Sequence, residues 1–319
     1  MRAFCLGLGL ALLGLGHHAP TPVVGVLSSL SARWDGDPVQ WWVADRAGGR
    51  VVGLDGQLFP QWVVAVPCPV GVARAGHGVW VVSVPGGGRH KGSVWTRLGD
   101  GSGPGESFRA GEYAGLVGLP DGGVLGLVGP APTRQWMHLD RHGRVVRREV
   151  FPGATHLAQV EGQVLVTNRV GEVWSFGLDR GMDGAHHAQV DATPRGVAPG
   201  PEGGWWWLGS NGDLLLLRAD LSVRWRRRAG ERAALLAGDG ERAWVVPDDR
   251  SWAECWDESG SPSGSFAMPL MGARAVRLTG KGGVLIALPG ALLELDPGGG
   301  VLRTQAGFDH LVSISEPEV

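Results

Sequence analysis

The chain has 319 residues, of which 43% are hydrophobic and 19% charged, and its formal net charge is −2. This length suits one large all-β domain or two smaller ones, and the hydrophobic content excludes a disordered chain. The charge balance gives no general attraction to nucleic acid or to an anionic membrane surface.

The N-terminus reads MRAFCLGLGLALLGLGHH, one arginine followed by an apolar run from Ala3 to Gly16. The run is too short for a comfortable membrane span. It is typical of a secretory signal peptide, which we place at residues 1–16 with cleavage before His17. The mature chain is then expected to be secreted or periplasmic. An uncleaved membrane anchor is the alternative.

An apolar strand recurs seven times along the rest of the chain. The second residues of these runs are at positions 40, 79, 124, 164, 205, 243 and 284, which gives a period near 40. A segment of small residues that ends in a turn precedes each run, and a strand ending in an acidic turn follows it. A more polar strand comes last, as at 145–150 and 223–228. Four strands per unit at this period are the signature of β-propeller blades.

The predicted fold is therefore all-β, a seven-bladed β-propeller in a single domain over 17–319. Its four-stranded antiparallel blades are expected near 29–66, 67–113, 114–154, 155–194, 195–230, 231–269 and 270–309, with a C-terminal closing strand at 310–316. A parallel β-solenoid fits less well because it predicts shorter periods. The first strand of the first blade also fits 30–36, with an outer strand at 23–28, so the terminus that closes the ring stays open.

The fifth unit contains the clearest hairpin, GWWWLGSNGDLLLL from Gly204 to Leu217. Asn211-Gly212 tolerates positive φ at both central positions and predicts a two-residue type I′ turn. That register sets Leu208 opposite Leu215.

Tryptophans fall mainly on the second and third strands, including Trp206 and Trp252. We predict that they pack between blades, with Trp34 and Trp62 as the exceptions. The mature chain contains Cys68 and Cys255. The repeat places them far apart, so we expect two unpaired, mostly buried thiols.

A Gly-led apolar strand, a short loop and a strand ending in Leu-Asp before a turn glycine recur, as at 283–298. This pattern resembles secreted bacterial propellers of the NHL, streptogramin-lyase-like and pyrroloquinoline-quinone-like repeat types, over about 22–316. The group mixes lyases, lactonases, assembly scaffolds and binding proteins, so the resemblance implies blade architecture more than activity. Trp256-Asp257 ends a third strand as in WD-like repeats. One blade alone has that pair, without the accompanying Gly-His, so we reject the WD subfamily.

Ligands of propellers usually meet the loops at one end of the central channel. These loops join the second strand to the third and each blade to the next. They carry the candidate ligand-binding residues His90, Arg134, His156, Asn168, Arg169, Arg195, Asn211, Asp248 and Asp249. For any single one, a plain solvated turn is the simpler interpretation.

The leading functional prediction is a non-catalytic extracytoplasmic binding or protein-interaction scaffold. We expect a monomer that takes a protein or a polar small ligand, with no nucleic acid partner, no membrane span in the mature chain, no metal site and no cofactor. A quinone-dependent dehydrogenase fits less well, because this sequence lacks the vicinal cysteines and the acidic metal ligands that are usual in such enzymes.

The alternative is a metal-dependent lyase or hydrolase at the channel mouth, for which the resemblance implies Ca²⁺ or Mg²⁺. Asn168 and Asp248 are the nearest equivalents of lactonase ligands. His156 and Glu231 are the nearest equivalents of the His and Glu pair of streptogramin lyases.

The one basic cluster is Arg224, Arg226, Arg227 and Arg228 around Trp225. A polyanion-binding strand is possible. We favour an outer blade strand whose arginines face solvent and protect the edge from pairing.

Overall fold

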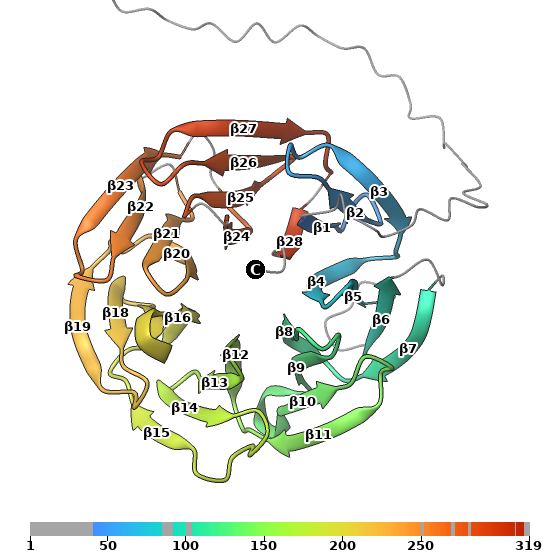
Figure 1. Cartoon of the computed structure of the whole chain (residues 1–319), viewed down its shortest axis with the longest axis horizontal. Helices are drawn as coiled ribbons and strands as arrows, with labels where there is room; N and C mark the ends of the chain where they lie inside the picture. The colour runs from blue at the N-terminus through green and yellow to red at the C-terminus, as the bar shows by residue number, and fades with distance from the viewer. Residues whose placement is uncertain are drawn as a thin grey trace, which may run out of the picture. The chain divides into compact units, whose positions relative to one another are not determined.

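The computed structural model describes residues 41–84, 92–99, 104–249, 252–268, 272–279, 282–309 and 311–315. In these ranges the chain forms seven four-stranded antiparallel sheets (Figure 1). The helical segments found there are two short 3-10 turns, at Ala131–Thr133 and Pro201–Gly203. None of the helices in the described part is long and apolar enough to cross a membrane.

The blades are numbered in chain order, with their strands given from the axis outward. Blade 1 consists of β28 (Leu311–Ser315), β1 (Trp41–Asp45), β2 (Arg50–Leu54) and β3 (Pro60–Ala65). Blade 2 consists of β4 (Pro69–Ala75), β5 (Gly78–Ser83), β6 (Ser93–Gly99) and β7 (Pro104–Ala110). Blade 3 consists of β8 (Tyr113–Gly118), β9 (Val124–Val128), β10 (Gln135–Leu139) and β11 (Val145–Val150). Blade 4 consists of β12 (Ala154–Val160), β13 (Gln163–Asn168), β14 (Glu172–Gly177) and β15 (His186–Gln189).

The remaining three blades follow the same order. Blade 5 consists of β16 (Pro194–Pro199), β17 (Trp205–Gly209), β18 (Asp213–Leu217) and β19 (Val223–Arg228). Blade 6 consists of β20 (Ala233–Gly238), β21 (Arg242–Pro247), β22 (Trp252–Asp257) and β23 (Pro262–Ala267). Blade 7 consists of β24 (Ala275–Leu278), β25 (Val284–Leu288), β26 (Ala291–Leu295) and β27 (Val301–Ala306).

The innermost strands contact one another in the order β28, β4, β8, β12, β16, β20 and β24, and β24 contacts β28 again. The ring is closed by β28, which pairs antiparallel with β1 and sets Ile314 opposite Val43. The C-terminal end thus supplies the innermost strand of blade 1. The segments considered for that blade at 23–28 and 30–36 lie outside the described residues, as does the signal peptide at 1–16. The prediction of an all-β, seven-bladed propeller is confirmed.

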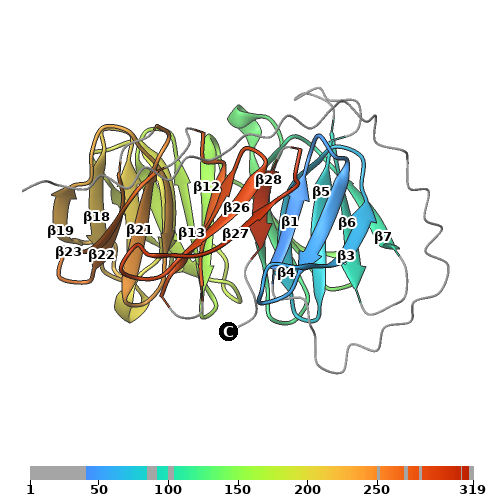
Figure 2. The same ribbon diagram turned by 90° about the horizontal axis from the view of Figure 1, so that it is seen from above.

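The core lies in the middle strands because neighbouring blades cover both of their faces. All residues of β9 and β17 are buried, whereas the outermost strands β11 and β27 alternate between exposed and half-buried positions. Seen from the side, the strands run between two faces of the ring (Figure 2). We call the face with the second-to-third-strand loops and the blade-to-blade connections the loop face.

The hairpin of blade 5 differs from the predicted register by one residue. Leu208 pairs with Leu214, not with Leu215. Gly212 has φ of 82°, its N–H donates to the Gly209 carbonyl at 3.0 Å, and Asn211 does not adopt positive φ. The loop is a three-residue hairpin loop with glycine in the left-handed position, so the type I′ prediction was wrong.

Tryptophans join the blades through packing and hydrogen bonds. The indole N–H of Trp80 donates to the Gly122 carbonyl of the next blade at 3.0 Å, and that of Trp206 donates to the Asp239 carbonyl at 2.9 Å. The prediction of interblade packing holds for Trp206, which is fully buried. It is wrong for Trp252, which is 59% exposed because it begins β22 at the loop face. Trp62 is half-buried and Trp34 lies outside the described residues.

Cys68 and Cys255 are free thiols. Cys255 is buried and Cys68 is half-buried. Burial raises the pKa of the Cys255 thiol, which keeps it protonated and unreactive at neutral pH.

Candidate functional site

The predicted site residues fall into two groups on the loop face. Blades 3 to 5 carry Arg134, His156, Asn168, Arg169 and Arg195, and blades 5 and 6 carry Asn211, Asp248 and Asp249. His90 lies outside the described residues. Antiparallel strands bring these loops together, since the second and fourth strands of a blade both end at this face.

Arg134 is a buried clamp between blades 3 and 4. Its side chain is 8% exposed, Nε donates to the Gly129 carbonyl at 3.2 Å and Nη1 donates to the Ala154 carbonyl at 2.5 Å. Burial lowers the pKa of the guanidinium, and the negative charge of Glu112 opposes this. The guanidinium is therefore used in holding the loop 129–134 against β12.

His156 links blade 4 to blade 5. It follows a bulge in the pairing of β12 with β13, and its Nε2 lies 3.0 Å from the Arg195 carbonyl. A carbonyl can only accept, so Nε2 carries the proton. Nδ1 lies 3.0 Å from the Thr155 hydroxyl oxygen and can accept a hydrogen bond from that hydroxyl. Burial lowers the pKa of the imidazole, so His156 is neutral and positions the two blades.

Asn168 closes a turn within blade 4. It is 6% exposed, and its Oδ1 accepts the N–H of Val170 at 3.1 Å and of Glu172 at 3.0 Å. Its Nδ2 donates to the Glu172 carboxylate at 2.5 Å. The amide oxygen, which is the atom a metal would use, is thus already bonded twice.

The two arginines of this group lie nearer to solvent. Arg169 is exposed, and its charge lowers the pKa of Arg134. Arg195 is also exposed, and its Nη1 donates to the Ala233 carbonyl of blade 6 at 2.6 Å. Both are exposed cationic groups of the loop face.

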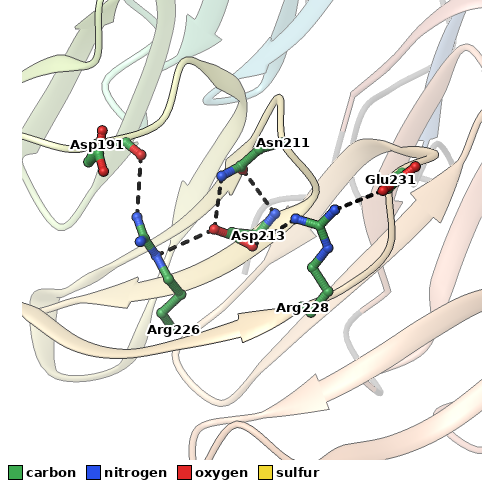
Figure 3. Close-up of polar contacts among 6 residues, drawn as sticks. All are labelled: Asp191, Asn211, Asp213, Arg226, Arg228 and Glu231. Atoms are coloured by element: carbon green, nitrogen blue, oxygen red, sulfur yellow. Dashed lines mark hydrogen bonds and ion pairs between the residues drawn. The ribbon is translucent and has the colours of Figure 1, made fainter.

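Asn211 belongs to a charged network at blade 5, drawn in Figure 3. Its Nδ2 donates to the Asp213 carboxylate at 2.9 Å, and its Oδ1 accepts the Asp213 N–H at 3.1 Å. The Asp213 carboxylate also pairs with Arg226 at 3.5 Å and with Arg228 at 3.2 Å, and Arg228 pairs with Glu231 at 3.2 Å. The network fixes the connection from β19 to β20, which carries Glu231.

The other arginines of the basic cluster also have partners within the chain. Arg224 lies 4.0 Å from the Glu258 carboxylate. The guanidinium of Arg227 lies 5.6 Å from the centroid of the Trp225 ring and donates to the Gly260 carbonyl at 3.1 Å. This is the arrangement of a solvated outer strand.

Asp248 and Asp249 meet the same connection from the blade 6 side. The Asp248 N–H donates to the Arg232 carbonyl at 3.1 Å, and the Asp248 carbonyl accepts from Gly272 at 3.1 Å. The Asp249 carboxylate lies 3.9 Å from Nε of Arg232. The structure thus brings Asn211, Asp248 and Asp249 to two sides of one connection.

The central channel encloses about 580 Å³ and is lined by residues of all seven innermost strands. The lining is mostly small and apolar, as expected for first strands. Arg277 of β24 is one exception and was missed, although it interrupts the apolar run Ala275-Val276 in the sequence. Burial raises the pKa of the Tyr113 phenol to about 12, and the positive charge of Arg277 opposes this rise.

His156 and Glu231, the His and Glu pair of the metal-dependent alternative, bond to different groups of the chain. Among the described residues no group of three or more His, Cys, Asp or Glu side chains is placed to hold a metal ion. His156 contacts Arg195, whereas Glu231 pairs with Arg228. Sequence reasoning also missed Glu254, which shares a hollow with the exposed Trp252.

No protein-family model matches the sequence, and neither does any curated protein. Solved structures share the fold. A functionally unknown protein from Desulfotomaculum acetoxidans is 14% identical with a TM-score of 0.62, over 88% of this chain and 100% of that chain. Apo AztD from Citrobacter koseri is 11% identical with a TM-score of 0.62, over 88% and 99%. Virginiamycin B lyase from Staphylococcus aureus is 11% identical with a TM-score of 0.58, over 75% and 84%. At these identities the likeness shows the propeller fold.

Proposed function

We propose that this protein is a non-catalytic binding scaffold that presents its loop face to a protein or a polar small ligand. The observation that carries the proposal is the bonding of the candidate side chains. Arg134, His156 and Asn168 all bond to the chain's own backbone. Such a face is held in one geometry before a ligand arrives, which lowers the ordering cost of binding.

The cellular setting of this proposal rests on the sequence. The apolar run at 3–16 supports export through a signal peptide, so the proposed scaffold acts outside the cytoplasm. We further propose that it is a monomer without a cofactor. The repeat pattern supports kinship with the NHL, streptogramin-lyase-like or pyrroloquinoline-quinone-like propellers. N-terminal sequencing of the exported chain is expected to begin at His17, and a retained N-terminus would contradict cleavage.

A metal-dependent lyase or hydrolase is the second candidate, favoured by the fold shared with virginiamycin B lyase. The two are separated by thermal unfolding of the mature chain, 17–319, with Ca²⁺, Mg²⁺ or EDTA. A ligand that binds the folded state raises the melting temperature. The scaffold proposal expects no shift with any of the three. A rise that EDTA reverses and Asp248→Asn abolishes would favour the metal-dependent enzyme.

A further inference from the structure

A second hollow, of about 280 Å³, lies between blades 5 and 6. One wall is the connection from Ala229 to Ala233, and the other consists of Val245 and Pro247 from β21 with Trp252 and Glu254 from β22. The charged network of blade 5 holds the first wall, because Arg228 pairs with Glu231 at 3.2 Å (Figure 3).

Trp252 and Glu254 project from the same side of β22, since alternate residues of a strand share a face. Trp252 is 59% exposed, whereas Trp244 and Trp256 of the same blade are buried. Leaving most of an indole in water forgoes its burial in the core. Glu254 pairs in register with Val245, and both residues line the hollow together with Trp252.

The charges of the hollow are unequal in their surroundings. Glu231 has Arg228 at 3.2 Å and Arg232 has Asp249 at 3.9 Å, so these rim charges have counter-charges. Glu254 is half-buried. Burial raises its pKa and an interaction with the Trp256 side chain opposes this, which means that the negative charge is partly desolvated there. A positive ligand group would favour the charged form.

We propose that this hollow binds an organic ammonium group, with the indole face of Trp252 on one side and the carboxylate of Glu254 on the other. Tryptophan is the best aromatic partner for a cation, and the carboxylate adds an ion pair in a partly desolvated position. The apolar walls of Ala229, Val245 and Pro247 suit the methyl or methylene groups on the nitrogen. The inference rests on the proposed binding role of the loop face and names the ligand chemistry of one part of it.

The test is isothermal titration of the mature chain with tetramethylammonium chloride, against sodium chloride at the same ionic strength. We expect one saturable site, weakened about tenfold or more by Trp252→Ala and by Glu254→Gln, and weakened less by Trp252→Phe. Glu258→Gln, which changes an exposed carboxylate of blade 6 outside the hollow, is expected to bind like the wild type. Circular dichroism and melting temperature verify that each variant is folded.

Titration with glucose is the neutral comparison. The cation site is overturned if tetramethylammonium gives no saturable heat, or if both variants bind it like the wild type. It is also overturned if glucose binds and Trp252→Ala removes that binding while Glu254→Gln does not, because the hollow is then a neutral aromatic platform. Each of these results leaves the scaffold role standing. A metal-dependent rise in melting temperature that Glu254→Gln leaves unchanged would instead overturn the scaffold role.

Discussion

The two halves of the loop face use polar residues in opposite ways. At blades 3 and 4, Arg134 and Asn168 are buried and bond to the backbone. At blades 5 and 6, Arg228 and Glu231 are exposed and bond to each other, and Glu231 lines an open hollow. The repeat supplies loops at equivalent positions in both halves, yet their polar residues differ in burial.

The ends of the second strands illustrate this difference. Asn168 ends β13 and satisfies the N–H groups of its own turn. Gly209 and Pro247 end β17 and β21 and have no side chain that can do so. At these blades the blade-to-blade connections bond to the loops instead, through Ala229 N–H to the Gly212 carbonyl and Asp248 N–H to the Arg232 carbonyl. The hollow lies beside these connections.

The largest expected effect on stability distinguishes the buried Trp206 of blade 5 from the exposed Trp252 that lines the hollow. Trp206→Ala removes a fully buried ring and its N–H bond to Asp239, and should lower the free energy of unfolding by about 3–5 kcal/mol. Trp252→Ala removes an exposed ring and should change it by less than about 0.5 kcal/mol. Urea unfolding measures both. Equal losses would contradict the assignment of Trp252 to the surface.

Next in size is the clamp at blades 3 and 4. Arg134→Ala removes two charge-assisted bonds, to Gly129 and Ala154, and should cost about 1.5–3 kcal/mol of unfolding free energy. Arg169→Ala, at the adjacent exposed position, is the matched control and should change stability by less than about 0.5 kcal/mol. If the control costs as much, long-range charge and not the clamp stabilises this half.

The pH dependence of stability should also differ between the halves. The folded-state pKa of His156 is lowered from 6.5 by burial, so below that pH the unfolded state binds more protons and stability falls as the pH decreases. Burial also lowers the pKa of His138 from 6.5. His156→Gln should flatten the fall in melting temperature between neutral and acidic pH, and the further change His138→Gln should flatten it more. An unchanged profile would mean that His156 is not buried as a neutral ring.

The smallest effect concerns the exposed network of blade 5. Arg228 is 54% exposed and Glu231 is 86% exposed, so Arg228→Ala should cost about 0.2–1 kcal/mol and less in high salt. Thermal unfolding at low and high salt measures this. A salt-independent loss larger than that of Arg134→Ala would reverse the contrast between the two halves.

The sequence predicted the blades because every unit carries the same signals. The outer strands expected at 145–150 and 223–228 are β11 and β19, since alternating polarity at a solvated edge is a local property. The hairpin register was missed because one residue, Gly212, takes the left-handed conformation alone. For the site, the sequence assigned Arg134 and Asn168 to connections between second and third strands, and the structure places Arg134 just before β10 and Asn168 at the end of β13. The sequence could not show that both side chains are buried, because burial depends on residues distant in the chain.

What the sequence determined by itself is the seven-bladed ring, because its period, turn glycines and apolar middle strands repeat within each stretch of chain. What the tertiary structure decided is the use of each loop. Trp206 lies inside the second strand of blade 5 and is fully buried, whereas Trp252 begins the third strand of blade 6 at the loop face and is 59% exposed. The physical reason is that burial depends on residues tens of positions away in the chain, as at Trp206, which packs against Ala233, Ala243 and Val245 of blade 6.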